Sequence, residues 1–142
     1  MDNCPFCQII QSNTAVIESS DYSVTFLDIN PIRPGHVLIV PKEHEPDFFN
    51  LPTHVLTDIM KLAKRIAKAQ KLAFQPVKVG MLVAGFDVPH AHLHLIPMHD
   101  YHDITSKQLL EGKVYRAKQA ELEENKCKLR DALQEIKIHS TI

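Results

Sequence analysis

The sequence predicts an α+β fold with five short strands, one main helix and a C-terminal helical extension. Three observations support this fold class. Short apolar or alternating segments, separated by turn residues, recur on both sides of the middle of the chain. One long amphipathic stretch lies between them, at residues 53–74. A charged segment with apolar residues seven positions apart follows at residues 113–137.

The composition is that of a single globular domain. The chain has 142 residues, of which 44% are hydrophobic and 23% are charged, and these are ordinary globular values. The net charge of −1 argues against a broad nucleic-acid surface, so any bound nucleotide should be small. No apolar run reaches the length of a membrane span, and the N-terminus lacks a signal pattern. We therefore expect a cytoplasmic protein with no membrane partner and with reduced cysteines.

The first elements are expected to be a short helix and a hairpin. Residues 6–10 form a short apolar segment after a cysteine pair, long enough for one or two helical turns. Residues 15–18 and 22–28 are typical of strands. The polar triplet Ser19-Ser20-Asp21 between them favours a hairpin turn.

A loop, a strand and the main helix follow. Residues 28–35 contain two prolines and a glycine, which predicts a loop. The apolar residues 36–40 predict a strand that stops at Pro41. The helix is expected over residues 53–74, because one stripe of its surface is apolar. That stripe consists of Val55, Ile59, Ala63, Ile66 and Ala73.

The last elements are a strand pair and a second helix. Residues 77–83 predict a fourth strand, residues 84–87 a tight turn, and residues 90–97 its antiparallel partner. Residues 113–137 predict a long, mostly solvated helix with one narrow apolar seam. We expect the seam to pack on its own sheet or on a sister subunit. Its residues are Leu122, Leu129, Leu133 and Ile136.

The segment His90-Ala-His-Leu-His-Leu-Ile-Pro97 is the most informative part of the chain. Strict alternation is the β-strand period, so His90, His92 and His94 should share one face while the apolar residues enter the core. Near neutral pH, three imidazoles together offer a nucleophile, a proton shuttle or metal ligands. A histidine-rich surface strand is the structural alternative, although an apolar alternation inside the chain is not typical of a tag.

The pair Cys4-x-x-Cys7 has three interpretations. It could be a redox pair, half of a zinc site, or two incidental thiols. The redox interpretation is weak, because no strand precedes the pair and no βαβ pattern surrounds it. A tetrahedral zinc site would need two more ligands, which are commonly histidines.

Four ordered segments make the chain similar to the histidine triad (HIT) family of nucleotide hydrolases and transferases. Residues 90–96 match the family signature of three histidines alternating with apolar residues, and residues 4–10, 26–31 and 35–44 resemble its N-terminal blocks. The resemblance implies an antiparallel five-stranded sheet with one main helix, and a homodimer. It places a nucleotide-binding domain at residues 1–104, with residues 105–142 as its helical extension.

The resemblance also implies a mechanism and a set of site residues. The middle histidine, His92, falls on the family's nucleophile, which forms a covalent nucleotidyl-histidine intermediate. His94 and His36 match phosphate-contacting positions, and the three are the expected catalytic residues. Asp28 could bind both ribose hydroxyls, or it could cap the turn at Asn30-Pro31. The expected nucleotide contacts are Phe6, Ile9, Phe26, Asp28, Ile29, His36, Leu38, Asp87, His92 and His94.

The cysteine pair matches a zinc-binding branch of the same family. There His44 and His90 complete the ligand set with Cys4 and Cys7. Four protein ligands would leave no open position on the metal, so the zinc is expected to be structural. No organic cofactor is expected.

The chain departs from the family pattern just before the histidines. Relatives carry an asparagine and a glycine-rich stretch that ends in an amide and a hydroxyl residue, groups that bind the phosphate or leaving group. Here the stretch is shorter, Ala84 stands near the asparagine position, and Phe86-Asp87 replace the amide and hydroxyl pair. Asp87 near an anion would be repulsive unless it is turned away, protonated or paired.

The leading hypothesis is therefore a hydrolase of a purine nucleoside 5′-phosphate derivative such as an AMP or GMP ester or amide. The substrate would be a phosphoramidate, an acyl-adenylate or a dinucleoside polyphosphate, cleaved through His92. One alternative is a nucleotide-binding or sensing module with little turnover. Another is a metalloenzyme that uses the three histidines as ligands.

Overall fold

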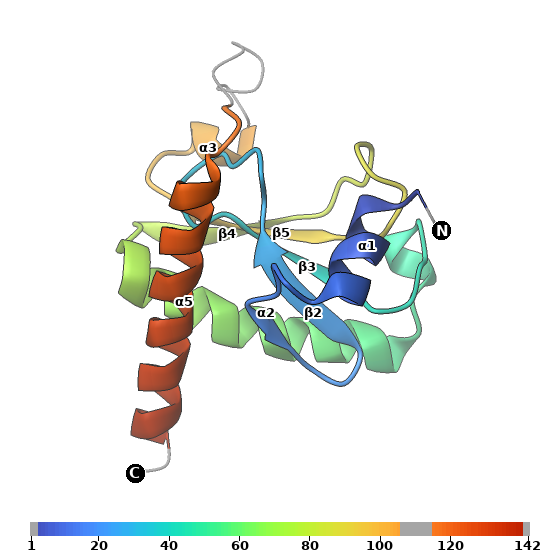
Figure 1. The fold of residues 1–142 in the computed structure, drawn as a ribbon, viewed down its shortest axis with the longest axis horizontal. Coiled ribbons are helices and arrows are strands. Elements are labelled where there is room, and N and C mark those ends of the chain that lie inside the picture. Colours follow the sequence, from blue (N-terminus) through green and yellow to red (C-terminus); the bar gives the residue numbers. More distant parts are fainter. Residues whose placement is uncertain (1–2, 106–114, 141–142) are drawn as a thin grey trace.

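The computed structural model describes residues 3–105 and 115–140 (Figure 1). Five antiparallel strands form one sheet in the order β1-β2-β3-β5-β4. The α+β fold class and the five-stranded antiparallel sheet predicted above are confirmed. The strands are β1 (Glu18–Ser19), β2 (Ser23–Leu27), β3 (Val37–Pro41), β4 (Lys78–Leu82) and β5 (Leu93–Met98).

The helices comprise two long and three short elements within the described residues. They are α1 (Pro5–Ser12), the 3-10 helix η1 (Phe48–Asn50), α2 (Thr53–Phe74), α3 (His102–Thr105) and α5 (Gln119–Ser140). In this part of the chain, no helix combines the length and the apolar character that a membrane crossing requires.

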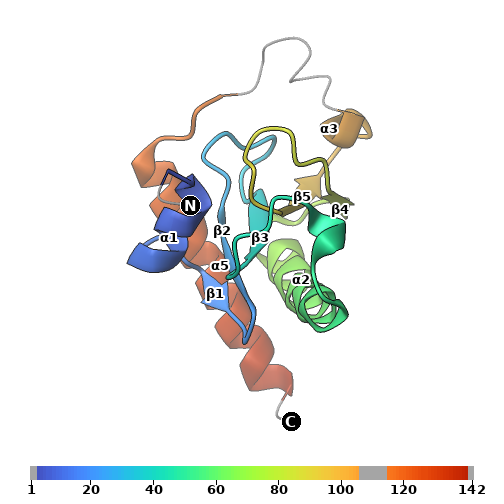
Figure 2. The same cartoon turned by 90° about the vertical axis from the view of Figure 1, so that its right-hand side faces the viewer.

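The sheet separates two apolar clusters, because side chains alternate between its faces. On β3, Val37 and Ile39 point to the face that α2 covers, and both are fully buried. Leu38 and Val40 point to the opposite face, where α1 packs with Phe6 against Phe26 of β2. Figure 2 shows the sheet lying between α1 and α2. The cysteine pair and His94 belong to the α1 face, which therefore carries the chemistry.

Helix α2 forms where the sequence predicts it, from Thr53 to Phe74. Its apolar stripe is buried against the sheet, with Ile59 and Ile66 fully inaccessible to solvent. Burial of one such side chain contributes roughly 1.5–3 kcal/mol. The helix ends where Gln75 adopts a left-handed conformation with φ 51° and its N–H donates to the Lys71 carbonyl.

Helix α5 packs mainly on α2 and only to a smaller extent on the sheet (Figure 1). It begins at Gln119, later than predicted: residues 115–118 are not helical, and residues 113–114 lie outside the described residues. The seam packs within the same chain, mainly on α2 and also on β2, and Leu129 and Leu133 are buried there. Arg130 adds a polar link, since its Nη2 donates to the Val16 carbonyl at 2.8 Å.

The histidine segment is only partly a strand, which corrects the prediction for residues 90–97. Strand β5 begins at Leu93, opposite Ile39 of β3. Continuing this register would place Ala91 opposite Pro41, which has no N–H to donate. The Ala91 N–H donates to the Glu45 carbonyl instead, and the Pro41 carbonyl accepts from the His90 ring. His90 and His92 therefore lie before the strand, in the segment that leads into it.

Candidate functional site

A cavity of about 540 Å³ lies on the α1 face of the sheet. Helix α1, strands β2 and β3, the loop after β2, and the segment leading into β5 supply its walls. The structure brings to this one cavity every residue that the sequence analysis predicted for nucleotide contact. These are Phe6, Ile9, Phe26, Asp28, Ile29, His36, Leu38, Asp87, His92 and His94.

One end of the cavity is apolar and aromatic. The rings of Phe6 and Phe26 lie 5.2 Å apart, and Phe6 meets the His92 ring edge-on at the same centroid distance. Ile29 stands half-open at the rim. Its carbonyl accepts from the Ala117 N–H at 2.9 Å, so the segment before α5 holds this rim in place. An apolar slot of this kind can take a flat heterocyclic ring.

His92 is held in one tautomer by the backbone. Its Nδ1 lies 2.7 Å from the His90 carbonyl oxygen, which can only accept, so Nδ1 carries the proton. The lone pair is consequently on Nε2. The side chain is almost fully buried and lines the cavity. A neutral imidazole in this state can act as a nucleophile through Nε2.

His36 and His94 form a second oriented pair. The Ile32 N–H donates to Nδ1 of His36 at 3.1 Å, so the proton of a neutral His36 is on Nε2. That Nε2 lies 2.9 Å from Nδ1 of His94 and donates to it. His94 must then carry its own proton on Nε2. The pair thus gives the cavity wall an imidazole N–H donor whose tautomer is set by a backbone amide.

Burial keeps both of these imidazoles neutral. Burial, together with the neighbouring His94 and His92, lowers the pKa of His36 to about 3. Burial and His92 lower the pKa of His94 to about 4. Both rings are therefore uncharged at pH 7, in agreement with the tautomers that the hydrogen bonds define.

Asp28 divides its two oxygens between the turn and the cavity. Oδ1 accepts from the Asn30 N–H at 2.8 Å, which is the turn-capping alternative considered from the sequence. Oδ2 lies 3.6 Å from Nε2 of His36 and 4.0 Å from Nδ1 of His94. Burial raises the pKa of this carboxyl, although the hydrogen bond from the Asn30 N–H acts to lower it. Because Oδ1 alone caps the turn, Oδ2 can also accept a hydrogen bond from a ligand.

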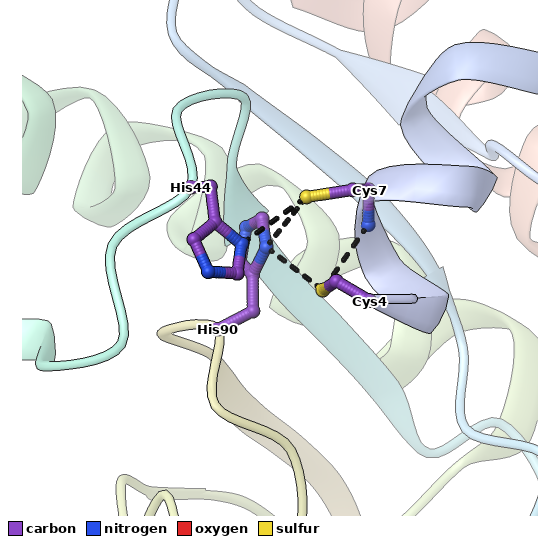
Figure 3. A group of neighbouring side chains, drawn as sticks. All are labelled: Cys4, Cys7, His44 and His90. Atoms are coloured by element: carbon purple, nitrogen blue, oxygen red, sulfur yellow. Dashed lines mark hydrogen bonds between the residues drawn. The ribbon is translucent and has the colours of Figure 1, made fainter. Parts of the chain in front are cut away.

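Cys4, Cys7, His44 and His90 converge at the N-terminal end of α1 (Figure 3). Their ligand atoms all lie within 4.8 Å of one another. Nδ1 of His90 is 3.4 Å from the Cys4 sulfur and 3.5 Å from the Cys7 sulfur, and Nδ1 of His44 is 3.2 Å from the Cys7 sulfur. A tetrahedral zinc with Zn–S near 2.3 Å and Zn–N near 2.0 Å requires S to N separations of about 3.5 Å.

The His90 ring is already oriented for a ligand role. Its Nε2 lies 2.9 Å from the Pro41 carbonyl and donates to it, which leaves the Nδ1 lone pair facing the sulfurs. Burial and the Cys4 sulfur raise the pKa of the Cys7 thiol in the metal-free protein, so a metal must displace its proton. The donor set, the separations and the orientation all fit one metal ion.

A second group of possible ligands, Asp28, His36 and His94, is less suited to a metal. The Ile32 N–H occupies the Nδ1 lone pair of His36. A neutral His36 therefore has a proton on Nε2, at the position where a metal would have to bind. This hydrogen bond disfavours a metal ion on His36, and so on the group as a whole.

Sequence reasoning missed Gln70, which supports the two histidines from beneath. Its Nε2 donates to the Gly35 carbonyl at 2.9 Å and to the Leu95 carbonyl at 3.0 Å. Gly35 precedes His36 and Leu95 follows His94, so one buried amide ties the segment before β3 to strand β5. The available signal was a polar residue in the apolar stripe, since position 70 continues the spacing of Ile59, Ala63 and Ile66.

Comparisons with known proteins agree with this arrangement. Residues 10–101 match the HIT domain family. The yeast (Saccharomyces cerevisiae) adenosine 5′-monophosphoramidase HNT1 is 42% identical over 100 residues, which span 68% of this chain and 63% of the yeast protein.

Two solved structures share the fold over nearly their whole length. A HIT-like protein from Bartonella henselae has a TM-score of 0.77 at 27% identity, covering 93% of this chain and 98% of that one. A zinc-bound histidine triad protein from Mycobacterium smegmatis has a TM-score of 0.78 at 23% identity, covering 97% and 98%. The chain belongs to the histidine triad (HIT) family.

Proposed function

We propose that the protein hydrolyses purine nucleoside 5′-phosphate derivatives, with adenosine 5′-phosphoramidates as the leading substrates, through a covalent intermediate on His92. The observation that carries this proposal is the 2.7 Å contact between Nδ1 of His92 and the His90 carbonyl. It leaves the Nε2 lone pair of a buried imidazole available in the cavity. The similarity to the yeast adenosine 5′-monophosphoramidase supports this choice of substrate.

The first step would transfer the nucleotide to the protein. Nε2 of His92 attacks the α-phosphorus and forms a phosphorus–nitrogen bond, while the bond from phosphorus to the leaving amine breaks. The amine takes up one proton as it leaves. The imidazole becomes positively charged, and the His90 carbonyl stabilises that charge through Nδ1–H. The Nε2–H of His94 would donate to a phosphate oxygen on which negative charge develops.

The second step would release the nucleotide. A water molecule attacks the same phosphorus, and the bond to Nε2 of His92 breaks. The water oxygen stays on the nucleoside monophosphate, and one proton returns to solvent. The two steps together consume one water and regenerate neutral His92.

The apolar and acidic walls suggest how the nucleoside would lie. The slot between Phe6, Phe26 and Ile29 suits a purine ring. Asp28 stands between that slot and the histidines, where Oδ2 could accept from ribose hydroxyls. Its Oδ1 remains bonded to Asn30, so the turn fixes the direction of the carboxylate.

We also propose a structural zinc ion held by Cys4, Cys7, His44 and His90. The similarity in fold to a zinc-bound histidine triad protein supports the identity of the metal, and the S₂N₂ donor set and spacing support the site. When bound, the metal would tie helix α1 to the segment that leads into β5. The Phe6 wall and the His92 nucleophile would then be held in a fixed relation.

The test is hydrolysis of adenosine 5′-phosphoramidate, followed as AMP release. We expect turnover by the unchanged protein, loss of at least about 1,000-fold in His92→Ala, and retained AMP binding in that variant. His102→Ala, an exposed histidine away from the cavity lining, is the matched control. Full activity in His92→Ala would refute the proposal.

The alternative of binding with little turnover has one observation in its favour. Among the described residues that line the cavity, Asn30 is the sole side-chain amide, and none is a hydroxyl residue. A transition-state oxyanion would therefore have few donors. Tight AMP binding with no AMP release from any phosphoramidate would support this alternative over hydrolysis.

A further inference from the structure

The cavity carries negative charge without a matching cation. Asp28 and Asp87 line it, and His36 and His94 are neutral at pH 7. Of the lining residues within the described part of the chain, none is a lysine or an arginine. Phosphate sites commonly use such cations. A leaving group with further phosphates would bring more negative charge into an already acidic cavity.

Asp87 has a free carboxylate at the mouth of this cavity. Its side chain is exposed, and it makes no hydrogen bond or ion pair with the residues that the structure describes. Its field nevertheless reaches the reacting end of the site. It raises the pKa of His94 against the effect of burial, and it contributes to the raised pKa of Asp28. An unpaired carboxylate so placed can attract a cation on a ligand.

Phe86, one residue before Asp87, adds an exposed aromatic ring to the same loop. Its side chain is 94% exposed, the highest exposure of any large apolar residue among those described. In the chain it stands between Ala84 and Asp87, which line the cavity, while Phe86 itself is not a lining residue. Gly85 before it has φ +82°, a backbone conformation that favours glycine. An aromatic ring and a carboxylate on adjacent residues of an exposed loop can together recognise an organic ammonium group.

We infer that Phe86 and Asp87 select the leaving group, and that it is an amine bearing a second, positively charged ammonium group. The inference rests on the proposed function and names its substrate class: nucleoside 5′-phosphoramidates of diamines or of basic side chains. The scissile nitrogen leaves phosphorus as described above. The distal ammonium stays charged and pairs with Asp87 against Phe86. Anionic leaving groups are disfavoured by the same carboxylate.

The test uses three adenosine 5′-phosphoramidates with leaving amines of similar length. One amine ends in an ammonium group, one in a methyl group and one in a carboxylate. The measured quantity is the ratio of kcat/KM for the ammonium substrate to that for the carboxylate substrate. Comparing this ratio between proteins cancels the intrinsic reactivity of each amine. We expect it to fall by about 10-fold in Asp87→Asn, by more in Asp87→Lys, and by about 3-fold in Phe86→Leu.

Matched variants and salt complete the design. Asp87→Glu should keep most of the selectivity, because the carboxylate remains. Asp131→Asn, which removes an exposed carboxylate on α5, should leave the ratio unchanged. Added salt should lower the ratio of the unchanged protein, since the loop is open to solvent. An equal ratio in the unchanged protein and in Asp87→Asn would overturn the inference.

Failure of the proposed function would be seen separately. If the unchanged protein cleaves none of the three substrates, hydrolysis is refuted, and the inference is then decided by their dissociation constants. Tightest binding of the ammonium compound, lost in Asp87→Asn, supports selection by charge. Equal binding of all three compounds contradicts it.

Discussion

Nε2 of His36 lies 2.9 Å from Nδ1 of His94, and the Ile32 N–H sets the direction of the hydrogen bond between them. Because Ile32 donates to Nδ1 of His36, the proton between the rings belongs to His36. His94 can therefore present an N–H to the cavity only through Nε2. The arrangement holds while both rings are neutral, which gives it a pH dependence.

Stability should fall as the pH is lowered from about 6.5 toward 4. An unfolded histidine has a pKa near 6.5, whereas the folded pKa values are about 3 for His36 and about 4 for His94. In this window the unfolded chain binds more protons, so acid favours unfolding, and each unit of pKa difference contributes about 1.4 kcal/mol. The free energy of unfolding by urea, measured across this range, checks the prediction.

The variant His94→Gln should flatten that pH dependence, because one of the two titrating rings is gone. His54→Gln is the control, since His54 is exposed and lies on α2 away from the cavity. The same slope in the unchanged protein and in His94→Gln would contradict the assignment.

Asp28→Asn should weaken the recognition of ribose while keeping the turn. The asparagine Oδ1 can still accept from the Asn30 N–H, but the anionic acceptor for hydroxyl groups is lost. We expect the preference for AMP over 2′,3′-dideoxy-AMP to drop by about 10-fold, since a hydrogen bond to a charged group contributes roughly 1.5–3 kcal/mol. Calorimetric dissociation constants for the two nucleotides measure it. An unchanged preference would leave Asp28 with the turn-capping role alone.

Cys4→Ser should lose bound zinc and lower the melting temperature. Its sulfur contributes one of the four ligand atoms, and a serine hydroxyl is a poor replacement for a thiolate. Metal content by elemental mass spectrometry, on protein purified without added zinc, gives the first readout. Thermal unfolding with and without a chelator gives the second. Cys127→Ser is the matched control, because Cys127 is exposed on α5 and outside the group.

Gln70→Leu should destabilise the fold and impair turnover together. The substitution leaves the buried Gly35 and Leu95 carbonyls without their donor. Removal of a buried hydrogen-bond partner costs about 1–3 kcal/mol. The Gln70 Oε1 is buried and has no partner among the described residues, so its removal offsets part of this cost. We expect a net loss of about 2 kcal/mol in the free energy of unfolding. Gln11→Leu, an exposed position on α1, should have little effect.

The sequence was sufficient where a local pattern decides the structure. The stripe from Val55 to Ala73 has a helical period, and α2 begins and ends at the predicted residues. The entry to β5 was mispredicted because it depends on Pro41, which lies far away in the sequence and meets Ala91 only through the register of two strands. The apolar seam of α5 was predicted from its spacing, but the element it packs on, α2, depends on tertiary structure.

The site shows the same division. The spacing of Cys4 and Cys7 left a zinc half-site as one possibility, and the family resemblance added His44 and His90; the structure brings the four together. The tautomers of His36 and His92 depend instead on the Ile32 amide and the His90 carbonyl. Every residue carries such backbone groups, so no sequence motif reveals which of them will orient a ring.

The covalent intermediate is the central claim. Mass spectrometry of protein that has been quenched rapidly, without acid or heat, tests it most directly. The protein is mixed with adenosine 5′-phosphoramidate, quenched within one turnover and digested. The account predicts one adenylyl group on the peptide that contains His92, carried by Nε2, and none in His92→Ala. An adduct on another residue, or AMP release by His92→Ala at the normal rate, would contradict it.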